Sequence, residues 1–124
     1  MSKPRIGFIG VGLMGHGMAK NIALKGYKLV VLGHRNRAPV EHLKTLGASE
    51  APSPRELALQ SDIVHLCVTG STQVEALLRG PDGVIASGKS GLIVLDCSTS
   101  NPVSTLALGD ELKAAGMTLV DAPL

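Results

Sequence analysis

The sequence predicts a doubly wound parallel α/β sheet in a single domain that covers residues 1–124. Three observations predict this fold class. Short apolar runs alternate with helical patterns along the chain, the connections between them are short, and aromatic residues are almost absent. Because each strand-to-strand connection carries a helix, right-handed crossovers and a parallel sheet are expected. A core of Val, Ile, Leu, Ala and Met suits a sheet that is buried on both faces.

The first half of the chain contains three strand–helix units. Buried strands are predicted by apolar runs at residues 5–10, 28–32 and 48–51. Helices are expected at residues 13–25, 39–46 and 54–60. The first helix has apolar residues at four-residue spacing, and Gly26 and Gly47 mark the ends of the first two. Ser53 and Glu56 have the spacing of a capping box at the start of the third.

The second half of the chain repeats the alternation. Strands are predicted at residues 63–68, 92–96 and 117–120, and helices at residues 72–78 and 101–115. Gly80-Pro-Asp-Gly83 predicts a turn, and Gly116 ends the last helix. The two halves are therefore consistent with the two mononucleotide-binding units of a doubly wound sheet.

Composition and charge exclude several classes of function. A net charge of +2 and the scarcity of aromatic residues argue against a nucleic-acid partner, and no apolar run approaches a membrane span of about 20 residues. Cys67 and Cys97 are interpreted as buried thiols, and no His or Cys cluster has the spacing of metal ligands. His65, inside a strand run, is interpreted as structural. Because the N-terminus leads directly into a strand, no signal peptide is expected, and we expect a cytoplasmic location.

A glycine motif at residues 10–15 carries the functional prediction. The first strand is followed by Gly10-Val11-Gly12-Leu13-Met14-Gly15, the G-x-G-x-x-G pattern. Gly10 permits a tight turn, Gly12 lets a pyrophosphate approach the backbone, and Gly15 allows close helix–sheet packing. The helix that follows offers free N–H groups and a partial positive charge to phosphates. With a strand before it and a helix after it, the motif predicts dinucleotide binding; the alternative is a packed strand–helix corner.

The loop after the second strand favours NADP(H) over NAD(H). An NAD-binding fold usually has an acidic residue there, which accepts a hydrogen bond from the ribose 2′-hydroxyl. This chain has Gly33-His34-Arg35-Asn36-Arg37 instead. Arg35 is expected to bind a 2′-phosphate, with His34 and Asn36 in support. The alternative is an ordinary solvated basic loop.

Two later loops follow predicted strands and are expected on the cofactor side of the sheet. They are residues 67–72 and residues 96–102. The second loop contains three hydroxyl side chains, which can either bind ligand or cap the following helix.

The segment from Phe8 to Asn21 resembles the N-terminal signature of the β-hydroxyacid dehydrogenases. It reads Phe-Ile-Gly-Val-Gly-Leu-Met-Gly-His-Gly-Met-Ala-Lys-Asn. That family includes 3-hydroxyisobutyrate dehydrogenase and 6-phosphogluconate dehydrogenase, with imine reductases as relatives. The resemblance continues through residues 80–84, 96–102 and 121–123 and so extends over the whole chain.

The resemblance implies an oxidoreductase that transfers hydride between NAD(P) and a small β-hydroxyacid. It implies that residues 10–15 hold the pyrophosphate and that Arg35 matches the arginine of an NADP-type loop. Val68 and Thr69 match a Leu-Pro pair beside the cofactor, and Thr99 matches a threonine beside the nicotinamide ribose. A helical C-terminal domain, which in the family binds substrate and usually forms the dimer, has no counterpart among these 124 residues.

Departures from the family pattern limit what can be carried over. Gly17 replaces a proline, Val68-Thr69 replaces Leu-Pro, and Leu124 stands where valine is usual. None of the lysines fits the family's catalytic lysine, so no catalytic residue is assigned within this chain. Two other classes stay open: a non-catalytic NADP-binding or regulatory module, and, far less favoured, a methyltransferase that uses S-adenosylmethionine.

Overall fold

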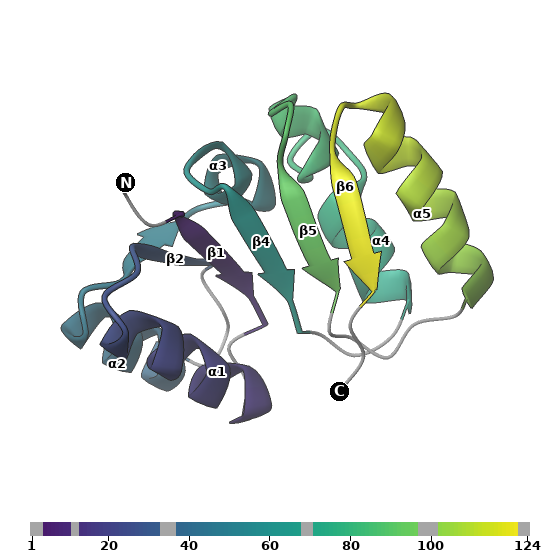
Figure 1. Ribbon diagram of the computed structural model, residues 1–124. Helices are drawn as coiled ribbons and strands as arrows, with labels where there is room; N and C mark the ends of the chain where they lie inside the picture. Colours follow the sequence, from purple (N-terminus) through teal and green to yellow (C-terminus); the bar gives the residue numbers. More distant parts are fainter. Residues whose placement is uncertain (1–3, 11–12, 33–36, 68–70, 97–101, 122–124) are drawn as a thin grey trace.

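The computed structural model describes residues 4–10, 13–32, 37–67, 71–96 and 102–121 (Figure 1). The strands are β1 (Ile6–Ile9), β2 (Leu29–Leu32), β3 (Ser49–Ala51), β4 (Ile63–Leu66), β5 (Ile93–Asp96) and β6 (Thr118–Asp121). The helices are α1 (Leu13–Leu24), α2 (Arg37–Thr45), α3 (Pro54–Leu59), α4 (Ser71–Leu78), α5 (Pro102–Ala114) and the 3₁₀ helix η1 (Ile85–Ser87). Every predicted strand and helix is therefore present.

All six strands form one parallel sheet in the order β3-β2-β1-β4-β5-β6. β1 lies in the middle, where Ile6 is paired with Leu29 of β2 on one side and with Ile63 of β4 on the other. The chain extends the sheet in one direction through β3 and then returns to extend it in the other direction. This reversal confirms the doubly wound fold class and places the topological switch point between β1 and β4.

Helices cover the two faces of the sheet in separate layers (Figure 1). Phe8 of β1 belongs to the core beneath α1 and α2, whereas its neighbour Ile9 belongs to the core beneath α3, α4 and α5. Successive side chains of a strand point to opposite faces, so each strand contributes to both cores. The larger core, on the α3–α4–α5 side, includes the fully buried residues Leu57, Leu66 and Leu112.

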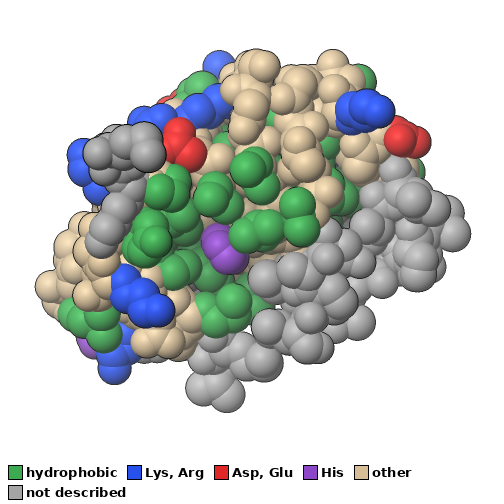
Figure 2. Space-filling model, viewed as in Figure 1, with side chains coloured by type: hydrophobic (Ala, Val, Ile, Leu, Met, Phe, Trp, Pro, Cys, Tyr) green, Lys and Arg blue, Asp and Glu red, His purple; other side chains and the backbone are tan. Residues whose placement is uncertain are grey.

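The α1–α2 face of the sheet is only partly covered by described residues. α1 contacts β1 and β2, α2 contacts β3, and within the described ranges no helix lies over β5 and β6 on that side. Ile93 and Val120 there are 38% and 40% exposed. Figure 2 shows hydrophobic side chains gathered over the sheet on this face. Parallel sheets are normally buried on both faces, so this apolar surface is unusual for the fold.

Three local features differ from the sequence prediction. The α2 helix begins at Arg37, two residues before Pro39. A proline in the first helical turn is tolerated because the first N–H groups have no intrahelical partner. β4 ends at Leu66 rather than at residue 68, and η1 was not predicted because a three-residue 3₁₀ turn has no detectable periodicity.

The start of α3 agrees with its predicted cap. The Ser53 hydroxyl accepts a hydrogen bond from the Glu56 backbone N–H at 3.2 Å, and Pro54 occupies the first turn. The helix has only six residues, of which Leu57 and Ala58 are buried against the sheet. The helix contacts β1, β2 and β3.

Gly7 of β1 sets how closely α3 approaches the sheet. A Cβ atom at this position would lie within 2.5 Å of Leu57 Cδ2 and closer still to the Ser61 hydroxyl. Ser61 is fully buried, and its hydroxyl donates to the Leu57 carbonyl at 2.7 Å. Both neighbours are therefore held in place, so a methyl group at Gly7 requires α3 to move.

We expect Gly7→Ala to lower the free energy of unfolding by about 1–3 kcal/mol through overpacking. The matched control is Gly17→Ala, because nothing lies within 4 Å of a Cβ at this exposed position in α1. That variant should be neutral or gain up to about 1 kcal/mol from helix propensity. Urea unfolding followed by circular dichroism measures both, and equal stabilities would contradict the packing argument.

Candidate cofactor-binding site

The carboxyl ends of all the strands lie at one edge of the sheet (Figure 1). Residues 10–15 follow β1, residues 33–36 follow β2, residues 68–70 follow β4 and residues 97–101 follow β5. The strand ends that precede the four predicted site segments therefore lie at this edge, where ligands of open α/β sheets bind.

Only part of the predicted site lies within the described residues. Gly10 is described, and Leu13, Met14 and Gly15 are described as the first turn of α1. The others fall outside the described residues: Val11, Gly12, His34, Arg35, Asn36, Val68, Thr69 and Thr99. Their roles stay predictions.

The turn out of β1 requires a glycine. Gly10 has φ of 100°, in the left-handed region that other residues adopt only with strain. Immediately before it, the Ile9 carbonyl accepts a hydrogen bond from the Cys67 backbone N–H at 2.9 Å. This bond joins the end of β1 to the residue that follows β4. The glycine motif and the Val68-Thr69 pair consequently start from adjacent points at the switch point of the sheet.

The start of α1 presents an electrostatically suitable site for an anion. Its first turn contains no acidic residue, so no carboxylate of its own neutralises the positive end of the helix. The first N–H groups of a helix have no intrahelical acceptors and can donate to phosphate oxygens. A tight turn followed by a helix start without acidic residues fits the pyrophosphate of a dinucleotide.

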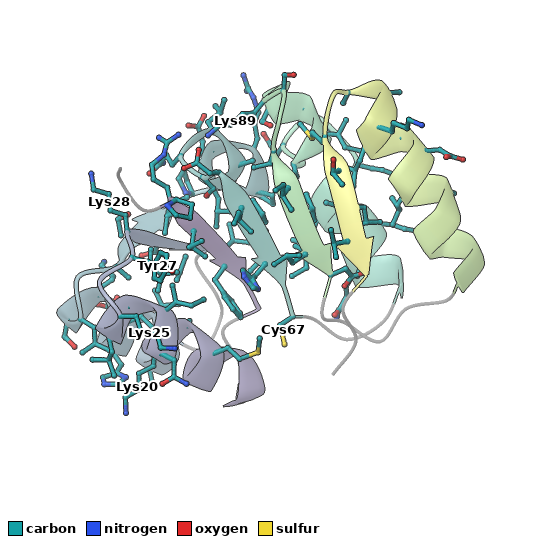
Figure 3. All side chains as sticks on the ribbon, in the orientation of Figure 1. Lys20, Lys25, Tyr27, Lys28, Cys67 and Lys89 are labelled. Atoms are coloured by element: carbon teal, nitrogen blue, oxygen red, sulfur yellow. The ribbon has the colours of Figure 1, made fainter. Side chains whose placement is uncertain are left out.

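A buried acid lies near the same edge. Asp96 ends β5 and is 1% exposed, and it contributes to raising the pKa of the Cys67 thiol, for which burial is the larger cause. Cys67 is a free cysteine and stays protonated near neutral pH (Figure 3). The sequence placed Asp96 at the end of a buried strand and in the segment 96–102 on the cofactor side, but gave a role only to the hydroxyls that follow it. The available signal was a carboxylate at the end of an otherwise apolar strand.

His65 is packed against Phe8 inside the sheet, which agrees with a structural role. Its ring stacks on Phe8 with centroids 5.5 Å apart and an interplanar angle of 6°. Burial lowers the pKa of His65, so the ring is neutral at neutral pH. Within the described part of the chain, no group of three or more His, Cys, Asp or Glu residues could hold a metal ion, and no helix is long and apolar enough to span a bilayer.

Residues 5–124 match the family described as the NAD-binding domain of 6-phosphogluconate dehydrogenase. The chain belongs to this family. The match confirms the resemblance to the β-hydroxyacid dehydrogenases and the assignment of the fold to NAD(P) binding.

Individual relatives agree with this assignment. The chain is 37% identical over 123 residues to an Arabidopsis thaliana mitochondrial protein described as 3-hydroxyisobutyrate dehydrogenase-like 2, covering 99% of this chain and 41% of the relative. It is 37% identical over 120 residues to an NAD-dependent L-serine dehydrogenase of Pseudomonas aeruginosa, covering 97% of this chain and 40% of that protein.

A solved structure shows the same fold. It is an imine reductase of Myxococcus stipitatus in complex with NADP⁺, with a TM-score of 0.84 and 26% identity, covering 95% of this chain and 40% of that one. The present chain thus spans about two fifths of the length of the proteins that it matches.

The glycine turn can be tested with two positions of equal backbone strain. Gly10 and Gly47 both have φ of 100°, but Gly47 ends α2, and nothing lies within 4 Å of a Cβ added there. We expect Gly10→Ala and Gly47→Ala each to cost about 1–2 kcal/mol of stability from left-handed strain. Only Gly10→Ala should also weaken dinucleotide binding, by at least about tenfold.

Calorimetric titration with NADPH and NADH, under conditions where both variants stay folded, measures the difference. If Gly10→Ala binds the dinucleotides as tightly as Gly47→Ala does, the glycine turn is only a structural corner.

Proposed function

We propose that this chain is the nucleotide-binding part of an oxidoreductase that acts on a small β-hydroxyacid, and that it prefers NADP(H) to NAD(H). The observation that carries the proposal is the Gly10 turn at the switch point, followed by a helix start without acidic residues. When bound, the nicotinamide cofactor would supply or accept the hydride.

The preference for NADP(H) is supported by the residues that follow β2. Leu32 ends β2 next to β1, so residues 33–36 begin beside the strand that leads into the glycine motif. These residues contain no carboxylate to repel a 2′-phosphate. We propose that Arg35 binds the 2′-phosphate through paired hydrogen bonds, supported by His34 and Asn36.

The nicotinamide side of the site would be formed by the segments after β4 and β5. We propose that Val68 and Thr69 lie against the cofactor and that Thr99 is placed beside the nicotinamide ribose. Gly10 through Gly15 would hold the pyrophosphate, including Val11, Gly12, Leu13 and Met14.

The chemical step needs groups that this proposal does not place in the chain. A hydroxyacid must be held against the nicotinamide, and a proton must be moved at its hydroxyl oxygen. Figure 3 shows Lys28 and Lys89 near the amino ends of the strands, before β2 and after η1, whereas Lys20 lies on α1. We therefore propose that substrate binding and proton transfer belong to a second, helical domain.

The partly uncovered sheet face supports a second domain. Ile93 and Val120 are more than a third exposed, and a pocket of about 320 Å³ is lined by Ile22, His65 and Ile63, the partner of Ile93 in the sheet, among others. The relatives have about three fifths of their length beyond the matched region. We propose that the second domain covers this apolar face and that the complete enzyme is a homo-oligomer. A cytoplasmic location, without a nucleic-acid or membrane partner, completes the proposal.

Parallel titrations with NADPH and NADH, followed by the fluorescence of the cofactor, test the proposal. We expect NADPH to bind about tenfold more tightly, because a 2′-phosphate gains charge-assisted hydrogen bonds. Arg35→Ala should remove most of that advantage while leaving NADH binding nearly unchanged, and His34→Asp should remove it by repelling the 2′-phosphate while favouring the 2′-hydroxyl of NADH. Lys113→Ala is the matched control, since it removes one positive charge on α5, at the opposite end of the sheet.

Each possible result has a distinct meaning. Tighter NADH binding would keep the site but overturn the role of Arg35. A lack of binding to either cofactor would overturn the proposed function. The same samples are assayed for oxidation of L-serine and 3-hydroxyisobutyrate with NADP⁺, and turnover by this chain alone would contradict the need for a second domain. Tight binding of the cofactor by this chain, without turnover, would favour the alternative of a non-catalytic regulatory module.

A further inference from the structure

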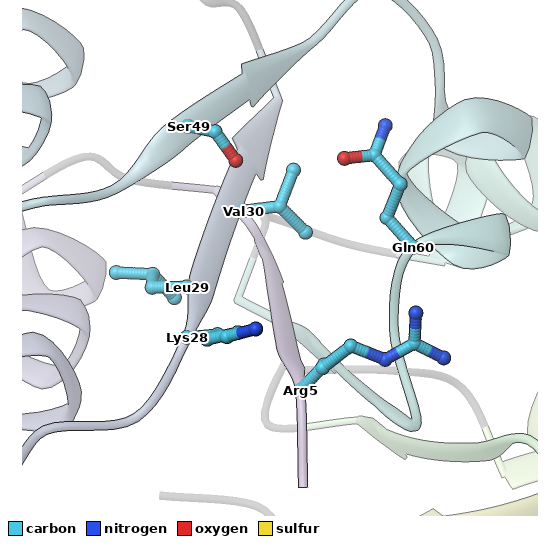
Figure 4. A pocket seen from close by; sticks show the side chains of 6 residues that line it. All are labelled: Arg5, Lys28, Leu29, Val30, Ser49 and Gln60. Carbon is cyan, nitrogen blue, oxygen red and sulfur yellow. The ribbon is translucent and has the colours of Figure 1, made fainter.

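A second hollow lies at the opposite edge of the sheet from the cofactor-binding site. It has a volume of about 200 Å³ and is lined by Arg5, Lys28, Leu29, Val30, Ser49 and Gln60 (Figure 4). Arg5 precedes β1, Lys28 precedes β2, Ser49 begins β3 and Gln60 caps the end of α3. The hollow thus lies between the end of α3 and the amino ends of β1, β2 and β3.

The lining of this hollow is cationic. Arg5 and Lys28 contribute positive charge, Ser49 and Gln60 contribute neutral donors, and no carboxylate belongs to the lining. Val30 is buried and contributes an apolar side chain on the α3 face, whereas the side chain of Leu29, which also lines the hollow, belongs to the core on the opposite face of the sheet. Figure 4 shows Lys28 and Ser49 pointing from the β2–β3 side toward the side that carries Gln60. In this view Gln60 turns its side-chain oxygen toward Ser49, and a half-turn of the amide would present its N–H donors to the same space.

One neighbouring carboxylate reduces this charge but does not cancel it. Asp62 accepts hydrogen bonds from the Arg5 side chain at Nε and Nη2, at 3.4 and 3.3 Å, and lies 3.7 Å from Lys89 Nζ. The backbone and side chain of Arg5 lower the pKa of Asp62 to about 2, so it stays ionised. Three cations (Arg5, Lys28 and Lys89) against one carboxylate leave a local charge of +2.

Lys28 is the cation with the greatest freedom to bind a ligand. It is exposed, and it makes no ion pair with any carboxylate that the structure describes. Lys89, in contrast, also donates to the carbonyls of Leu59 and Ser61. Arg5 keeps its Nη1 group outside the hydrogen bonds to Asp62.

We propose that this hollow binds a phosphate group, either as inorganic phosphate or as a small phosphate monoester. The tetrahedral oxygens of phosphate can accept hydrogen bonds from both walls at once, whereas the two oxygens of a carboxylate lie in one plane. An ammonium and a guanidinium group are the side chains that bind phosphate most often. The bound anion would join the amino ends of β1, β2 and β3 to the end of α3. The site is separate from the cofactor edge, so it does not depend on the proposed function.

Titration with sodium phosphate at constant ionic strength, set with sodium chloride, tests the proposal by two-dimensional ¹H–¹⁵N NMR of the whole chain. We expect saturable shifts of the Val30, Ser49 and Gln60 amides, with a dissociation constant on the order of 1 mM. Lys28→Gln should raise this dissociation constant about tenfold, because it removes one charge-assisted hydrogen bond to the phosphate. Lys113→Gln, the matched loss of an exposed lysine, should leave them unchanged. A parallel titration with methyl phosphate distinguishes a monoester from inorganic phosphate.

The same spectra report the cofactor edge through the amides of Gly10 and Cys67. Shifts confined to that edge would overturn the proposal, because phosphate would then bind only where a dinucleotide phosphate does. An equal response in Lys28→Gln and the unmodified chain would also overturn it, since it would show general screening of charge. A saturable response at Ser49 and Gln60 that depends on Lys28 supports it.

Discussion

The common direction of the six strands is the constraint on which the rest of the structure depends. A parallel sheet brings all the carboxyl ends to one edge and all the amino ends to the other. At the carboxyl edge, the chain must turn from strand to helix, and Gly10, with its left-handed φ, begins the turn from β1 toward α1. At the amino edge, the same geometry brings Arg5, Lys28 and Ser49 together from three separate strands.

The fold could be predicted from sequence because its signals are local. The apolar run before Gly10, the helical spacing after it and the glycines that end the helices all act within a few residues. Strand order and register could not be predicted this way, because they depend on pairings such as Ile6 with Ile63 across the chain. The short α3 helix was predicted with its Ser53 cap, but the hollow between its end and the amino ends of the strands is visible only in the three-dimensional packing.

The candidate site was predictable to a similar degree. Gly10 and the start of α1 were identified from the spacing of three glycines, and their geometry agrees with an anion site. The proposed roles of Arg35 and Thr99 rest on sequence and resemblance. The amino-edge hollow was missed, because its lining comes from residues that are distant in the chain. The cluster of Arg5, Asp62 and Lys89 has no local sequence signature.

The central claim is that the Gly10 turn and the first turn of α1 hold the phosphates of a nicotinamide dinucleotide. A crystal structure of the chain grown with saturating NADPH tests it most directly. The account predicts the pyrophosphate within hydrogen-bond distance of the backbone N–H groups between residues 10 and 15, with the 2′-phosphate beside residues 34–36. A dinucleotide bound anywhere else on the chain, with the Gly10 turn in contact with solvent alone, would contradict the account.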